Sequence, residues 1–68
     1  MKVTEKFLTK MAEDLRASGM QIKVNWSGQL CYVADISKGH RKMCCGTNRE
    51  IYAFLCGYSE AYFAARRK

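Results

Sequence analysis

Hydrophobic residues near the start of the chain recur every three to four positions. They are Phe7, Leu8, Met11 and Leu15. This spacing puts them on one face of a helix and predicts a helix over residues 4–18. Thr4 is a suitable N-cap, and Gly19 follows where a left-handed residue commonly ends a helix. The first element is therefore expected to be an amphipathic helix.

The middle of the chain alternates with a period of two instead. Apolar and polar residues alternate over 20–25, and residues 30–36 are rich in side chains that favour strands. Trp26-Ser27-Gly28 lies between them, and a three-residue loop with glycine last suits a tight hairpin. This loop predicts that Val24 faces Leu30 and that Ile22 faces Tyr32, so that these apolar side chains share the core face.

The last two elements complete the predicted order. Residues 41–45 form a short third strand, expected at a sheet edge because it is charged. Thr47 and Glu50 match a capping box that opens a helix over 48–66. The sequence therefore predicts a single α+β domain over residues 1–68, ordered helix–strand–strand–(strand)–helix. An antiparallel sheet of two or three strands is expected to be covered on one face by the two helices.

The last helix carries more apolar surface than one core can cover. Its expected core face holds Ile51, Leu55, Tyr58 and Tyr62, with Phe54 and Ala65. A second stripe of Tyr52, Cys56 and Phe63 lies roughly 130° away around the helix. Gly57 belongs to a line of small residues along which another backbone can approach. These residues are either half covered by neighbouring loops or form a protein interface, most simply in a homodimer.

Composition narrows the class of protein. The chain has 68 residues, 49% of them hydrophobic and 26% charged, with a net charge of +6. This balance is not that of a disordered chain, and no apolar run is long enough to span a membrane. The start shows no secretory signal. We expect a soluble, basic, cytoplasmic protein.

The positive charge is concentrated in the second half of the chain. Residues 1–35 hold five Lys and Arg against four acids, whereas residues 36–68 hold seven against two. Five cationic or titratable residues are candidates for binding nucleic acid or another polyanion: Lys38, His40, Arg41, Lys42 and Arg49. Trp26 and Tyr52 are candidates for stacking on bases if the fold brings them near.

The chain lacks the usual motifs of catalysis and metal binding. Its four cysteines are separated by twelve, zero and ten residues, which is not the spacing of a structural zinc site, and His40 is the only histidine. We find no carboxylate pair in an expected cleft, no nucleophile elbow and no phosphate-binding glycine loop. The sequence therefore predicts no metal, no cofactor and no enzymatic activity.

The order helix–strand–strand–strand–helix is similar to that of double-stranded-RNA-binding domains. That family has a lysine-rich start to its last helix and a glycine-proline and histidine signature in a strand connection. The matching stretch here, residues 46–51, has one arginine and one acid, and the loop 26–28 has neither proline nor histidine. No RNA-binding residues are therefore carried over. The short basic chain also has the look of small accessory proteins of phages and mobile elements.

Two functions follow as expectations. The first is a non-enzymatic nucleic-acid-binding accessory or regulatory protein. The alternative is a protein-interaction module, either a homodimer or an adaptor or inhibitor of a larger partner, with no role in nucleic-acid binding.

Overall fold

The first helix, α1, spans Glu5–Ala17 in the computed structural model, which describes residues 2–66. Thr4 caps it as expected, because its side-chain oxygen accepts a hydrogen bond from the Phe7 N–H at 3.1 Å. Leu8 and Ala12 are buried against the rest of the molecule, while Phe7 remains 41% exposed. The apolar stripe of α1 is therefore wider than the part that enters the core.

Three strands follow and form one antiparallel sheet in the order β1-β2-β3. Their bounds are Ile22–Ser27 for β1, Leu30–Asp35 for β2 and Arg41–Gly46 for β3. A short 3-10 helix, η1 (Ile36–Lys38), joins β2 to β3. The expected third strand is present and lies at the edge of the sheet.

The predicted hairpin register is wrong by three residues. Ser27 pairs with Leu30, and Val24 pairs with Val33 instead of Leu30. The loop is therefore Gly28-Gln29, and Gly28 has a φ of 65°, as the first position of a type II′ turn requires.

This register reverses which side chains of β2 are buried. Cys31 and Val33 are fully buried, whereas Leu30 is 50% exposed and Tyr32 is half-buried. Because β2 is apolar at consecutive positions, its alternation does not decide which face meets the helices. The smaller residues face inward, where the helix side chains already occupy the space.

The last helix, α2, spans Asn48–Arg66 and begins at the predicted capping box. The Thr47 N–H donates to Glu50 Oε1 at 2.9 Å, and the Glu50 N–H donates to Thr47 Oγ1 at 3.3 Å. A Cβ at Gly46 would lie 2.8 Å from Glu50 Oε1. The glycine therefore leaves room for the glutamate to fold back over the helix start.

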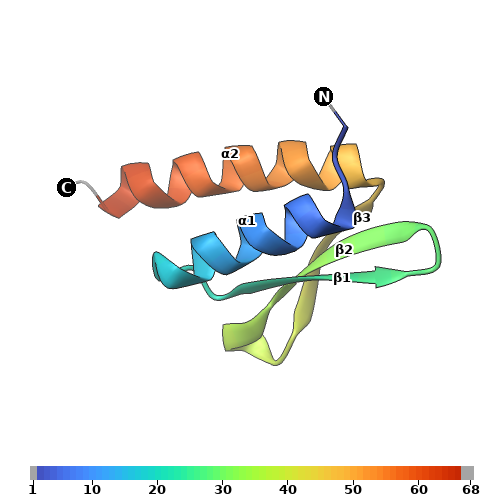
Figure 1. Cartoon of the computed structure of the whole chain (residues 1–68). Coiled ribbons are helices and arrows are strands. Elements are labelled where there is room, and N and C mark those ends of the chain that lie inside the picture. Colours follow the sequence, from blue (N-terminus) through green and yellow to red (C-terminus); the bar gives the residue numbers. More distant parts are fainter. Residues whose placement is uncertain (1, 67–68) are drawn as a thin grey trace.

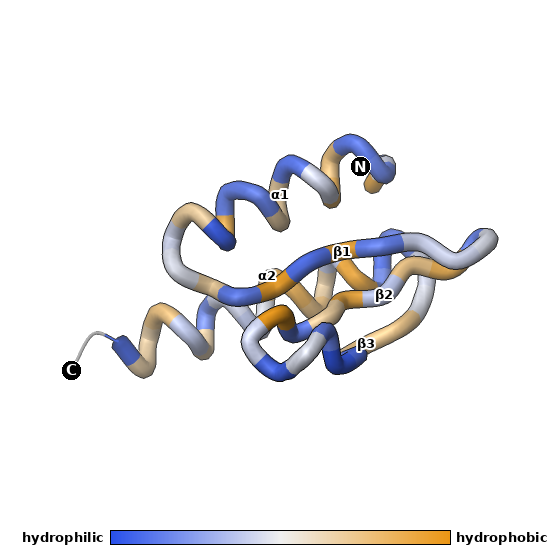
Figure 2. Tube along the Cα trace, turned by 90° about the horizontal axis from the view of Figure 1, so that it is seen from below, coloured by the Kyte–Doolittle hydropathy of each residue, from blue (hydrophilic) through white to orange (hydrophobic). Residues whose placement is uncertain are grey.

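The two helices cover one face of the sheet, which confirms the predicted fold class (Figure 1). Both begin at the same end of the molecule, with α1 packed mainly on β1 and α2 on β2 and β3. Hydrophobic residues recur along β1 and β2, and the start of β3 is strongly hydrophilic (Figure 2). The core lies between the layers. Its largest fully buried side chains are Leu8, Met20, Ile22, Ile51, Leu55, Val33 and Cys31.

Candidate functional site

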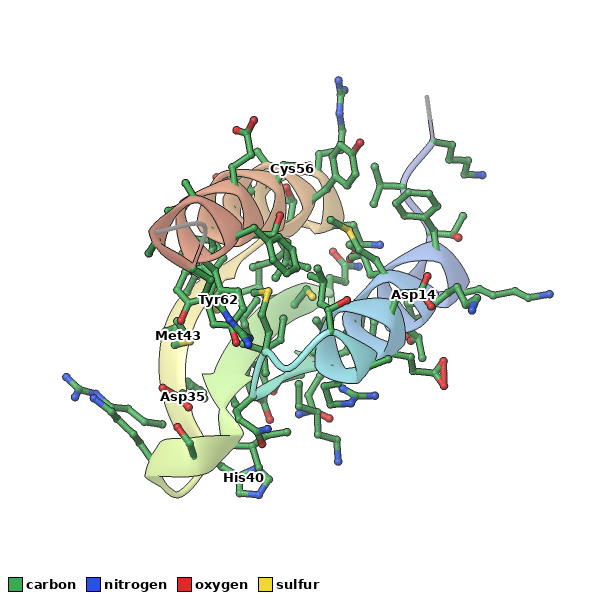
Figure 3. All side chains as sticks on the ribbon, turned by 90° about the vertical axis from the view of Figure 1, so that its left-hand side faces the viewer. Asp14, Asp35, His40, Met43, Cys56 and Tyr62 are labelled. Carbon is green, nitrogen blue, oxygen red and sulfur yellow. The ribbon has the colours of Figure 1, made fainter. Side chains whose placement is uncertain are left out.

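The turn between β2 and β3 carries most of the predicted basic residues. Asp35 Oδ1 accepts hydrogen bonds from the Ser37 N–H at 3.0 Å and from the Ser37 hydroxyl at 2.6 Å, which caps η1. His40 then takes a left-handed conformation with a φ of 61°. Figure 3 shows Asp35 and His40 at this turn, at the end of the sheet that lies away from α2 in this view. The chain is thereby turned directly into the start of β3.

Three of the predicted cations line one cleft at this turn. Lys38, Arg41 and Lys42 surround a cleft of about 360 Å³, together with Asp35, Met43 and Tyr58. Within residues 2–66, the only ion pair with a distance below 4.0 Å joins Lys10 and Asp14. The three cations therefore have no direct carboxylate partner among the described residues. His40, also exposed, adjoins them in sequence. We call the cleft lined by Lys38, Arg41 and Lys42 the β3 cleft.

The structure does not bring Arg49 to the β3 cleft. Six residues of extended strand, Arg41–Gly46, separate the turn from the start of α2, and at ~3.3 Å per residue this is roughly 17 Å. Arg49 instead lines a second cleft beside the β1–β2 loop. Glu5 and Trp26 also line this second cleft. Glu50 already caps the helix start, and hydrogen bonding to Thr47, first to its N–H and then to its side chain, lowers the pKa of its carboxyl.

Trp26, a candidate for stacking, has a structural partner that sequence reasoning missed. Its indole N–H donates to Asn48 Oδ1 at 3.0 Å, and Asn48 Nδ2 donates to the Val3 carbonyl at 3.2 Å. One side chain thus joins the N-terminal segment, β1 and the start of α2. No sequence motif marks this long-range contact.

The predicted interface residues lie along α2 with different degrees of exposure. Tyr52, Cys56 and Phe63 are half-buried and Gly57 is exposed. Phe63 contacts Tyr62 edge-on, with ring centroids 5.3 Å apart. Hydrogen bonding to the Cys56 thiol raises the pKa of the Tyr52 hydroxyl. Most of this stripe is therefore partly covered within the chain itself.

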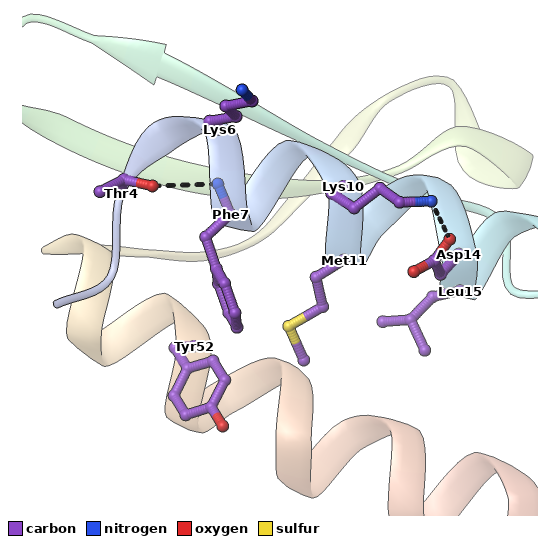
Figure 4. A pocket seen from close by; sticks show the side chains of 8 residues that line it. All are labelled: Thr4, Lys6, Phe7, Lys10, Met11, Asp14, Leu15 and Tyr52. Carbon is purple, nitrogen blue, oxygen red and sulfur yellow. Dashed lines mark hydrogen bonds and ion pairs between the residues drawn. The ribbon is translucent and has the colours of Figure 1, made fainter. Parts of the chain in front are cut away.

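Tyr52 also forms one wall of an apolar groove between the helices (Figure 4). The groove has a volume of about 620 Å³, and Phe7, Met11 and Leu15 line it from α1. Phe7 and Tyr52 contact edge to face with ring centroids 5.6 Å apart. The lysines at its rim are Lys6 and Lys10, and Lys10 is paired with Asp14 at 3.0 Å. The groove is hollowed at the outer surface where the two helices meet.

Three of the cysteines lie on the sheet and Cys56 lies on α2, and all four are free thiols. Cys31 is buried, Cys44 and Cys56 are half-buried and Cys45 is exposed. Burial, followed by the proximity of Cys45, raises the pKa of the Cys31 thiol to about 11. Among residues 2–66, no three His, Cys, Asp or Glu side chains are grouped so that they could hold a metal ion.

The outer face of the sheet carries residues that sequence reasoning assigned to the core. Tyr32 pairs with Cys45, and Ala34 pairs with Lys42, so these side chains share the face away from the helices. The Lys42 ammonium lies 4.7 Å from the centroid of the Tyr32 ring. With the correct hairpin register, the sequence would have placed Tyr32 and Ala34 on this outer face.

The chain matches no protein-family model, and no curated protein or solved structure is significantly similar to it. Within residues 2–66, neither helix combines the length and the apolar character needed to cross a membrane.

Proposed function

We propose that this chain is a small non-enzymatic nucleic-acid-binding protein, an accessory or regulatory protein of the phage or mobile-element type. The observation that carries the proposal is the β3 cleft, in which Lys38, Arg41 and Lys42 converge without a carboxylate within 4.0 Å among the described residues. Arginine and lysine that are free of acidic partners can neutralise phosphates, and the released counterions favour binding.

Asp35, the acid in the cleft, forms no ion pair with Lys38, Arg41 or Lys42. Asp35 uses its Oδ1 atom to accept two hydrogen bonds from Ser37. These bonds hold the turn that presents Lys38 on one side and Arg41 on the other. In this role Asp35 shapes the basic turn, and a phosphate can approach the cations from solvent.

The experiment compares two arginines, Arg41 at the start of β3 and Arg49 at the start of α2. Binding of a fluorescein-labelled duplex is measured by anisotropy between 50 and 200 mM NaCl for the wild type, Arg41→Gln and Arg49→Gln. We expect a steep salt dependence whose log–log slope falls in magnitude by about 0.9 in Arg41→Gln, the effect of one lost phosphate contact. Arg49→Gln removes the same charge and should leave the slope unchanged.

Two results would contradict the proposal. A wild-type slope near zero would show that phosphates are not being neutralised. Equal losses in Arg41→Gln and Arg49→Gln would show that only net charge matters and that the β3 cleft is not a site.

The groove between the helices favours a second candidate function, self-association as a homodimer. Phe7 is 41% exposed in this groove, and Tyr52 lies beside it. Sedimentation equilibrium should then give twice the mass of 7.8 kDa at tens of micromolar. Phe7→Asp should restore the monomer, whereas Leu30→Asp, on the opposite face of the molecule, should not. A wild-type monomer would rule out this candidate.

A further inference from the structure

The helices leave the opposite face of the sheet uncovered (Figure 1). The pairing register places on it Lys23, Asn25, Ser27, Leu30, Tyr32, Ala34, Lys42 and Cys45. All of these except Ala34 are at least partly exposed. None is acidic and two are lysines, so the face is electrostatically complementary to an anion. We call this surface the open sheet face.

Two large apolar side chains of β2 lie on the open sheet face, one at its hairpin end and one further along the strand. Leu30 is 50% exposed, and Tyr32 is half-buried two residues further along β2. The Lys42 ammonium lies 4.7 Å from the Tyr32 ring centroid. A cation over an aromatic ring is attracted by the negative face of the ring. This arrangement keeps a positive charge beside a flat apolar surface.

Lys42 also connects this face to the β3 cleft. It lines that cleft with Lys38 and Arg41 while its ammonium reaches over Tyr32. Of the cleft residues on β3, Lys42 is the one that lies on the open sheet face, so a phosphate bound at Lys42 would bring its adjoining bases to that face. Such a ligand must offer both repeated negative charge and flat apolar groups.

We infer that the open sheet face binds the unpaired bases of a single-stranded nucleic acid, with one base stacked on Tyr32 and its neighbour resting on Leu30. This inference rests on the proposed function and names its substrate class. Base–aromatic stacking needs a base whose face is not covered by its own neighbours, which a duplex does not offer.

The spacing along β2 also favours an unstacked strand. Two residues of strand separate Tyr32 and Leu30 by roughly 7 Å. Bases stacked in a duplex are only about 3.4 Å apart. Two consecutive bases can therefore rest on these two side chains only when they are unstacked from each other. When a phosphate draws the Lys42 ammonium away, the face of the Tyr32 ring becomes available.

The first test compares a labelled dT12 strand with a 12-base-pair duplex at one salt concentration. Tyr32→Leu keeps an apolar side chain but removes the aromatic ring. Tyr62→Leu is the matched control, because Tyr62 is a half-buried tyrosine of α2, on the helical side. We expect Tyr32→Leu to weaken dT12 binding by at least about fivefold, the lower end for one lost base–aromatic stack. Duplex binding should change by less than twofold, and Tyr62→Leu should change neither.

The outcomes separate this inference from the proposed function. If Tyr32→Leu leaves both affinities unchanged, or lowers both equally, while Arg41→Gln still reduces the salt slope, the inference is overturned and the proposed function stands. If neither the strand nor the duplex binds the wild type, both are overturned. Far-UV circular dichroism of each variant confirms that it is folded.

A second test needs no variant. Cys45 is exposed on the open sheet face opposite Tyr32, whereas Cys56 lies on α2 on the other side of the molecule. Saturating dT12 should slow alkylation of Cys45 by iodoacetamide several-fold, as read by peptide mass spectrometry, and leave Cys56 unchanged. Unchanged alkylation of Cys45 under saturation would overturn the inference.

Discussion

Replacing Asn48 with alanine should destabilise the whole fold, because this side chain joins three separate segments. Its Oδ1 accepts from the Trp26 indole N–H at 3.0 Å, and its Nδ2 donates to the Val3 carbonyl at 3.2 Å. Both contacts are partly buried. The substitution removes both partners at once and leaves the indole N–H and the carbonyl without them.

The magnitude follows from the two lost contacts. Each hydrogen bond contributes about 1 kcal/mol net, and a buried group left unpaired costs about 1–3 kcal/mol. Alanine favours the helix by up to about 0.7 kcal/mol, which offsets part of the loss. We therefore expect a net loss of about 1–3 kcal/mol. At ~0.05–0.15 kcal/mol per residue, a chain of this size has only about 3–10 kcal/mol in total.

Urea unfolding followed by far-UV circular dichroism measures this loss, and Asn25→Ala is the matched control. Asn25 lies on the open sheet face, and its side chain has no hydrogen bond within residues 2–66. A double-mutant cycle with Trp26→Phe isolates the contact between the two side chains, because phenylalanine keeps a smaller aromatic ring but has no N–H to donate. We expect a coupling energy above about 0.5 kcal/mol. A coupling within about 0.3 kcal/mol of zero would refute the reasoning.

Four other predictions concern α2 and the cysteines. Gly57→Ala should stabilise the protein by about 0.5–1 kcal/mol in thermal melts, because a Cβ there meets nothing within 4 Å and alanine is the better helix former. Leu55→Ala, at a fully buried position, should lower the free energy of unfolding by about 2–5 kcal/mol. The pKa of the Glu50 carboxyl is lowered in the folded state, so its ionised form stabilises the fold above the ordinary glutamate pKa. This stabilisation is lost as pH falls through the folded value. The melting temperature should therefore drop less between pH 6 and pH 3 in Glu50→Gln than in the wild type. With Ellman's reagent at pH 8, Cys45 should react first and Cys31 only on unfolding, because Cys31 is buried and its pKa is raised to about 11; rapid modification of Cys31 in the native protein would contradict this.

The element order and fold class could be predicted because local signals mark them. Thr4 and the pair Thr47 and Glu50 supply the expected hydrogen bonds at the helix starts. A helix needs an apolar stripe, a cap and a stop, and all three are local in sequence. The layer arrangement then follows, because both amphipathic helices must bury their stripes against the same sheet.

The hairpin register could not be predicted in the same way. It depends on which of two apolar faces of β2 meets the helices, and that choice is made by side chains far away in sequence. Trp26 turns inward and donates to Asn48, 22 residues later. Cys31 and Val33 then face the helices, and Tyr32 is left outside. The pattern predicts a strand here but does not distinguish its faces.

The residues of the β3 cleft were only partly predictable, because closeness in sequence does not always mean closeness in space. Lys38, Arg41 and Lys42 are neighbours in sequence, so a tight turn keeps them together in space. Arg49 is also close in sequence, but an intervening extended strand carries it to the other end of the sheet. The groove was missed because Phe7 shares its helical stripe with Leu8, and only the crossing of α2 determines which of the two is buried.

Cations at the two edges of the sheet also protect those edges from pairing with another chain. β1 and β3 are the two edge strands of the sheet, and charged side chains on an edge discourage pairing with another chain. Lys23 lies on β1, and Arg41 and Lys42 lie on β3. Under the proposed function, neutralising the β3 pair should lower phosphate binding and weaken protection of that edge at the same time. Arg49 carries an equal charge on α2, away from either edge. A loss of binding that is specific to Arg41, at equal solubility of the two variants, therefore separates recognition of the phosphate from the general effect of charge.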